Sequence, residues 1–181
     1  KLSHSILLAA LSISSLIVPQ KAQANLFRIN INETGGDVVF SFDGSIDTSE
    51  ATLSSFNGNP TNRLVTETFR SGSGSPAIWM GGDVGVGHIY NWSSGNVPAF
   101  GTNPNFIDAN DGYTVTSSGD TLAMFSASLV LPQNYDGSNI SGGMTFASTS
   151  FSELGITSGS YSWGLGDNNM QIVANSTPVP G

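Results

Sequence analysis

The 181-residue chain contains no cysteine. It therefore has no disulfide bond, no metal–thiolate site and no thiol nucleophile. Histidine is almost as scarce, since His4 lies near the start and His88 in the middle of the chain. A Ser-His-Asp triad in the body of the protein would have to use His88, which stands in an alternating segment typical of a β-strand. We therefore expect no catalytic activity.

Basic residues are few, because five Lys and Arg stand against thirteen Asp and Glu, for a net charge of −8. Nucleic acids and anionic lipid surfaces are bound through basic patches, so we expect neither as a partner. Most acidic residues lie in turn-like contexts, as Asp43, Asp120 and Asp136 do. No pair of carboxylates stands out by its spacing, so the sequence does not indicate a glycosidase.

The apolar run ILLAALSISSLIV, residues 6–18, has thirteen residues, too few for a membrane span of about 20. Lys1 and His4 precede it, and the small residues Ala22 and Ala24 follow it. This order is typical of a secretory signal peptide with an A-x-A cleavage site. We predict that residues 1–24 are removed by cleavage between Ala24 and Asn25.

Cleavage would leave 157 residues, the size of one domain. The mature net charge would be −10, because the two lysines of the leader, Lys1 and Lys21, are lost. A chain of this length buries about two thirds of the surface that it exposes when unfolded, so its core needs no covalent support.

Beyond the leader, apolar residues recur at every second position. One such run precedes the turn sequence ETGGD and another follows it, which predicts a β-hairpin whose strands each bury one face. Its apolar positions are Phe27, Ile29 and Ile31, then Val38, Phe40 and Phe42. The same alternation recurs at Ala123, Phe125, Ala127, Leu129 and Leu131, at Tyr161, Trp163 and Leu165, and at Met170, Ile172 and Ala174.

Gly, Asn, Ser and Pro cluster between these runs, as turn residues do. A helical pattern is limited to SFSELGI, residues 150–156, where Ser150, Glu153 and a following glycine would cap a single turn. We predict one all-β domain over residues 25–175, an antiparallel, jelly-roll-like β-sandwich with at most that one helical turn besides a helical signal peptide. Its predicted core contains Phe27, Ile29, Phe40, Phe42, Phe125, Leu129, Trp163 and Ile172.

The stretch VGVGHIYNW, residues 84–92, has two interpretations. Its larger side chains, His88, Tyr90 and Trp92 among them, share one strand face and would enter the core, while glycines on the other face let a second layer approach. Alternatively, Tyr90 and Trp92, together with Trp79, form an aromatic platform that packs against a sugar ring. Burial of both Tyr90 and Trp92 would exclude the platform.

The sequence DANDG, residues 108–112, is similar to a calcium loop, in which oxygens of alternate residues reach one ion. It departs from the D-x-[DN]-x-[DN]-G spacing, because Asp111 stands where a spacer is needed. We expect a plain turn and no metal or other cofactor. In the alternative, the ligands would be Asp108, Asn110 and Asp111.

The stretch from Leu129 to Asn175 resembles the C-terminal half of bacterial PEP-CTERM exported proteins. Leu131, Pro132 and Tyr135 match their LPxGY turn. A second element is matched by Thr145, Phe146, Phe151, Leu154 and Gly155, and a third by Gly159, Tyr161, Trp163 and Gly164. Residues 35–47 and 84–102 resemble the same proteins. The resemblance implies export, sorting by an exosortase and a cell-surface location.

The last residues, NSTPVPG, support this resemblance in part. Val179 and Pro180 match the start of the sorting motif, which in these proteins continues with Glu-Pro, a transmembrane helix and a basic tail; here Gly181 follows. We interpret residues 176–181 as a linker, stiffened by proline, and expect the anchor beyond Gly181. Membrane attachment would occur only through that segment.

Three classes of function remain at this stage. The first is a non-enzymatic protein of the cell envelope or extracellular matrix, with a structural or adhesive role. Its partners would be the secretion machinery and, by resemblance, the exosortase and an exopolysaccharide. The second is a carbohydrate-binding module that uses Tyr90 and Trp92. The third, a hydrolase, would show paired carboxylates in a cleft or His88 beside a serine and an aspartate.

Overall fold

The structure, a computed structural model, describes residues 26–55, 68–73, 75–81 and 87–176. The predicted leader and its cleavage site at Ala22, Ala24 and Asn25 lie outside these ranges. The linker residues Val179 and Pro180 also lie outside them. The signal peptide, its cleavage site and the linker therefore stay predictions.

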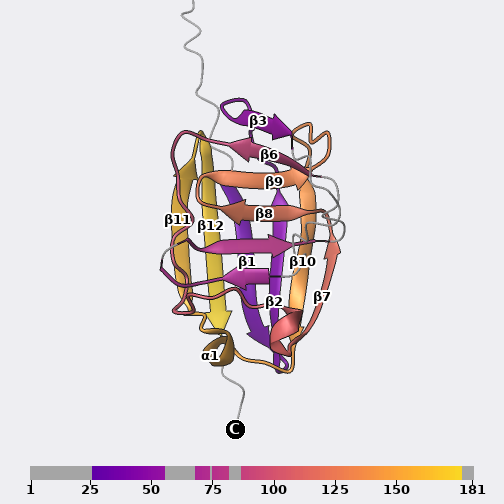
Figure 1. The fold of residues 1–181 in the computed structure, drawn as a ribbon, viewed down its shortest axis with the longest axis vertical. Helices are drawn as coiled ribbons and strands as arrows, with labels where there is room; N and C mark the ends of the chain where they lie inside the picture. Colours follow the sequence, from indigo (N-terminus) through magenta and orange to yellow (C-terminus); the bar gives the residue numbers. More distant parts are fainter. Residues whose placement is uncertain (1–25, 56–67, 74, 82–86, 177–181) are drawn as a thin grey trace, which may run out of the picture.

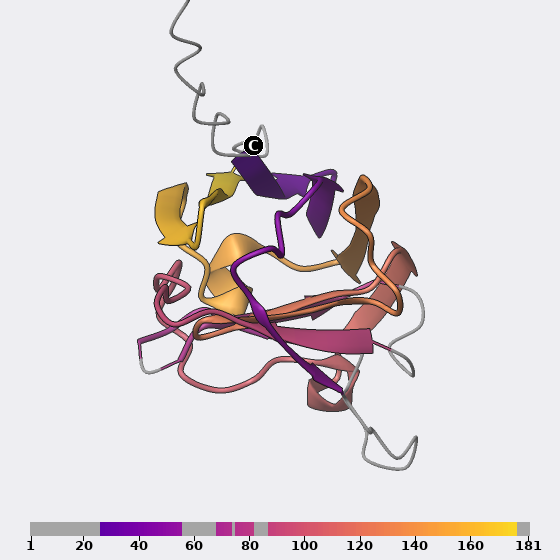
Figure 2. The same cartoon turned by 90° about the horizontal axis from the view of Figure 1, so that it is seen from above.

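Two six-stranded sheets pack face to face in the described part of the chain, which confirms the predicted all-β sandwich (Figures 1 and 2). Sheet A consists, in order, of β11 (Gly159–Leu165), β12 (Asn168–Ser176), β1 (Leu26–Thr34), β2 (Asp37–Gly44), β10 (Ile140–Ala147) and β7 (Thr114–Gly119). Sheet B consists of β3 (Thr52–Ser55), β6 (Gly87–Asn91), β9 (Ser128–Pro132), β8 (Leu122–Phe125), β5 (Ala77–Met80) and β4 (Thr68–Arg70). The strands of sheet B run crosswise to those of sheet A (Figure 1).

The predicted hairpin is formed by β1 and β2. Ile31 pairs with Phe40 and Ile29 with Phe42, and all four side chains are buried. The turn consists of Gly35 and Gly36, whose φ angles of 64° and 87° favour residues without a Cβ. The other edge of β1 pairs with β12 in parallel, so sheet A is mixed rather than purely antiparallel as predicted.

The segment 123–131 was predicted to place alternate residues on one face, and this is wrong for its first half. The chain turns at Ser126, whose φ is 50°, and separates β8 from β9. Leu122 and Met124 of β8 enter the core, whereas Phe125 is only partly buried and packs beside Trp79 on the outer face. The hairpin turn therefore reverses which residues face the core: even-numbered residues do so in β8 and odd-numbered residues in β9.

Six of the eight predicted core residues are buried; Phe125 and Trp163 are the exceptions. Trp163 lies in β11, an edge strand of sheet A, where its side chain is partly exposed although it packs against the core. The centre of the core is a cluster of four phenylalanine rings with centroids 5.0–6.2 Å apart. Its members are Phe40, Phe69, Phe100 and Phe146.

The predicted helical turn is α1 (Phe151–Leu154), and Ser150 and Glu153 form its capping box. A second turn, the 3₁₀ helix η1 (Ala109–Asp111), was not predicted. None of the helices within the described ranges has the length and apolar character needed to cross a membrane.

The side of the sandwich next to β11 is closed by residues 92–102, named here the closing segment. Trp92 lies beside Gly166, and a Cβ on Gly95 would lie 2.5 Å from the Gly164 carbonyl oxygen. At the other end, the amide of Thr102 donates to the Gly155 carbonyl at 2.8 Å. The closing segment therefore follows β11 along its length and buries Val97 and Phe100 beneath it.

Candidate functional site

The proposed aromatic platform does not exist. Tyr90 is 6% exposed and Trp92 is 7% exposed, and both belong to the hydrophobic core. Trp79 lies on the opposite face of sheet B, because its row continues through Ala123 and Val130 while Tyr90 pairs with Leu129. The rings of Tyr90 and Trp92 therefore cannot stack on a sugar, and the core interpretation is confirmed for these two residues. Residues 84–86 of the same stretch lie outside the described residues.

Tyr90 instead takes part in a core contact with Tyr135 of the LPxGY-like turn. Their rings meet edge to face with centroids 6.5 Å apart. The Tyr135 hydroxyl oxygen accepts a hydrogen bond of 2.7 Å from the Ile46 amide. Burial raises the pKa of both phenols, so they are neutral donors and acceptors at neutral pH. This contact fixes the turn after β9 to the segment that follows β2.

His88 lies in β6, paired with Leu131 of β9, and is partly buried. Within the ranges that the structure describes, no hydrogen bond joins it to a serine or an aspartate. The described carboxylates form no group of three or more with histidine that would suit a metal ion. The geometry of the described residues gives no support to a triad at this position.

The carboxylates have another use, because most of them accept hydrogen bonds from backbone amides at turns. Asp37 accepts from Ser148 at 2.9 Å, and Asp120 accepts from Ser141 at 2.9 Å. Hydrogen bonds from neighbouring serines lower the pKa of three carboxyls, which belong to Asp47, Asp136 and Glu153. The expectation that acidic residues serve turns is confirmed at these positions.

The DANDG stretch forms η1 and its caps. Asp108 accepts from the Asn110 amide at 2.6 Å, and Asp111 accepts from the Asp108 amide at 3.0 Å. Gly112 follows with a φ of 93°, the left-handed conformation that ends such turns. The stretch forms a turn, as expected, and its two carboxylates accept hydrogen bonds from the backbone.

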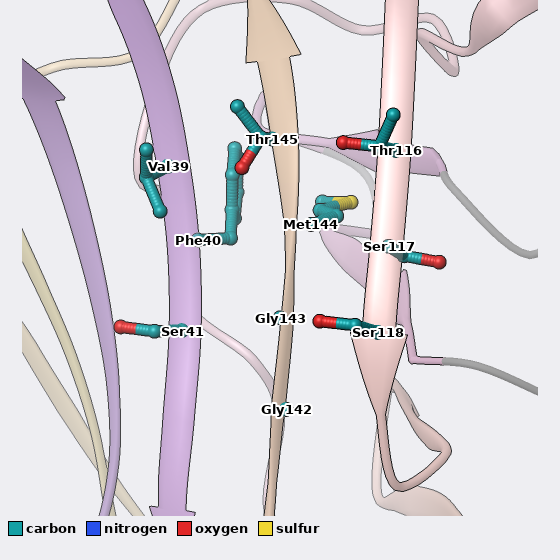
Figure 3. Close-up of a pocket in the computed structure, with 10 residues that line it drawn as sticks. All are labelled: Val39, Phe40, Ser41, Thr116, Ser117, Ser118, Gly142, Gly143, Met144 and Thr145. Carbon is teal, nitrogen blue, oxygen red and sulfur yellow. The ribbon is translucent and has the colours of Figure 1, made fainter.

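A shallow hollow of about 330 Å³ lies on the outer face of sheet A, over β2, β10 and β7 (Figure 3). Gly143 of β10 stands in register between Ser41 of β2 and Ser118 of β7. The next row contains Val39, Thr145 and Thr116, in the same strand order. Because Gly143 has no side chain, hydroxyl-bearing residues border an open floor; we name this feature the trough.

Close backbone approach explains the glycines of the trough. A Cβ on Gly142 would lie 2.7 Å from the Ser118 carbonyl oxygen, and one on Gly143 would collide with the Phe40 carbonyl oxygen.

A second hollow of about 380 Å³ adjoins the trough, shares Ser41 with it and extends over β1. It is lined by Leu26, Arg28, Asn30, Ser41, Phe42 and Asp43.

The trough was not predicted from the sequence. The alternation of apolar and polar residues does predict that Ser41, which stands between Phe40 and Phe42, points outward. Alternation cannot give the register between strands, which sets Ser41, Gly143 and Ser118 side by side although they span 102 positions of the chain.

Comparison with protein families, with curated proteins and with solved structures found no match to this chain.

Proposed function

We propose that the protein is a non-enzymatic, exported component of the cell envelope or extracellular matrix with a structural or adhesive role. In full length it would be held at the cell surface by a C-terminal anchor, and its partners would include the secretion machinery and an exosortase. Export follows from the leader-like residues 1–24, and the anchor from the PEP-CTERM resemblance.

The observation that carries the adhesive role is the outer face of sheet A. Its outward positions hold mostly hydroxyl and amide side chains, in rows that cross all six strands. One such row runs Ser160, Val173, Asn30, Ser41, Gly143 and Ser118. Such a face offers hydrogen bonds to a hydrated polymer. Most acidic side chains in the described part of the chain instead accept hydrogen bonds from backbone amides at turns.

Cell fractionation tests the location. The full-length gene, expressed in a bacterium with an exosortase, should yield the protein in the envelope or the medium. Mass spectrometry should find a mature chain that begins at Asn25. A cytoplasmic protein that retains Lys1 would contradict the proposal. A variant with Ala22→Leu and Ala24→Leu serves as control, because large side chains at these positions should block cleavage.

A further inference from the structure

The hydroxyl groups around the trough are available to a ligand. Ser41, Ser118, Thr116 and Thr145 make no side-chain hydrogen bond to any part of the chain that the structure describes. Thr116 and Ser118 are exposed, and Ser41 and Thr145 are partly exposed. By contrast, the inward-facing Ser117 of the same strand donates to the Gly81 carbonyl at 3.0 Å. Free hydroxyls are therefore concentrated on the outer side of these strands.

The spacing of these groups suits an extended ligand. Ser41 of β2 and Ser118 of β7 are separated by β10 and lie roughly 10 Å apart, with the backbone of Gly143 between them. The adjoining hollow continues the depression over β1 as far as Asn30 and Arg28. A chain molecule that lies across β1, β2, β10 and β7 would therefore meet polar groups along its whole course.

Charge restricts the nature of the ligand. No charged residue lines the trough, and in the adjoining hollow Arg28 stands opposite Asp43 in register. The whole chain has a net charge of −8, which repels polyanions. Hydroxyl groups both donate and accept hydrogen bonds, which is the capacity that matches another polyol.

We propose that the trough binds a segment of a neutral, extended polysaccharide through hydrogen bonds to Ser41, Ser118, Thr116 and Thr145. The proposal rests on the function proposed above and names the partner of the adhesive face. It replaces the aromatic platform, since the trough has no exposed ring and lies on the sheet opposite to Tyr90.

Affinity electrophoresis of the purified mature chain in native gels provides the test. The acidic protein migrates to the anode and is retarded when it binds an immobile polymer in the gel. The neutral probes are dextran, hydroxyethyl cellulose and a galactomannan, and the anionic probe is alginate. We expect retardation by at least one neutral polymer and none by alginate.

Two trough variants remove hydroxyls in separate rows, so that a folding defect in one leaves the other informative. They are Ser41→Ala with Ser118→Ala, and Thr116→Val with Thr145→Val. Each should raise the dissociation constant at least five-fold. The matched control is Thr114→Val, which removes a hydroxyl from the same strand outside the trough and should bind as the wild type does.

The proposal would be overturned by a wild type that no neutral polymer retards, by trough variants that bind as well as the wild type, or by equal retardation with alginate. A trough variant that leaves retardation unchanged but alters the molar mass of the protein in light scattering would also overturn the proposal. This result would indicate that the trough mediates self-association. Failure of polysaccharide binding with the protein at the cell surface leaves the proposed location intact. A cytoplasmic location would refute the proposed function independently of the gels.

Discussion

At the scale of single residues, several positions are determined by close contact rather than by their own side-chain chemistry. Gly101 of the closing segment is the clearest case, because a Cβ there would collide with the Gly155 carbonyl oxygen and with the Ser71 side chain. Ser71 is fully buried and donates to that same carbonyl at 3.1 Å. Glycine at 101 lets the closing segment approach the turn after α1.

The substitution Gly101→Ala should therefore destabilise the protein by about 1–3 kcal/mol, the usual cost of overpacking. Urea unfolding followed by tryptophan fluorescence measures the effect. Gly164→Ala is the matched control, since a Cβ there meets nothing within 4 Å. An equal loss in both variants would show that glycine itself, not the contact at 101, matters.

Tyr135→Phe removes the hydroxyl that accepts from the Ile46 amide and leaves that buried backbone donor without its partner. We expect a loss of about 1–3 kcal/mol in the free energy of unfolding. Tyr161→Phe, which removes a donor to the Thr157 carbonyl at the surface, should cost less. Chemical denaturation of the three proteins decides it, and equal costs would contradict the prediction.

At the scale of elements, hydrogen bonds between carboxylates and turns join segments that are distant in sequence. Glu33 at the end of β1 accepts from Phe151 at the start of α1, and Asp37 accepts from Ser148. Within α1, Glu153 accepts from the Ser150 amide at 2.8 Å. The Glu153 carboxyl accepts its bond from Ser150 more strongly when it is ionised, so the capping turn of α1 depends on pH.

Lowered pKa values make this dependence testable. The folded-state pKa of Glu153 lies below its ordinary value because Ser150 donates to it. Its stabilising effect is therefore fully present above the unfolded pKa and is lost as the pH falls through the folded value. The melting temperature should fall between about pH 5 and pH 3, and less steeply in Glu153→Gln.

The control for this experiment is Glu50→Gln, which changes an exposed carboxyl outside the capping turn and should retain the wild-type slope. Thermal melts by circular dichroism at half-unit pH steps are sufficient. A slope in Glu153→Gln equal to that of the wild type would show that the capping box does not contribute.

Prediction from the sequence succeeded where local pattern decides the structure. Alternation and a Gly-Gly turn gave the β1–β2 hairpin, and Ser150 with Glu153 gave α1, because both depend on neighbours in sequence. Prediction failed at Phe125, because the alternation of apolar residues continues from 123 to 131 although the chain turns at Ser126. It also missed the trough and the parallel partner of β1, which depend on register between distant strands.

At the scale of the whole molecule, β12 is the element on which sheet A depends. It pairs with β1 on one side and with β11 on the other, and it buries Met170, Ile172 and Ala174. Its loss would separate β11 from β1 and expose the core.

A chain that ends at Asp167 should therefore lose its cooperative unfolding transition. Differential scanning calorimetry would show no heat-absorption peak, and near-ultraviolet circular dichroism would lose its aromatic bands. Removal of residues 177–181 alone, which belong to the predicted linker and follow β12, should leave both signals unchanged. A cooperative transition in the shorter chain would show that sheet A closes without β12.

The parallel pairing of β1 with β12 also has a consequence for the order of events during synthesis. The ribosome releases β1 early, but its partner at residues 168–176 emerges only after almost all of the domain has been made. Until then the two native neighbours of β12 lack their common partner, and closure of the sheet must wait. If the protein is exported as we propose, this delay would help to keep sheet A open until a translocation channel receives the extended chain.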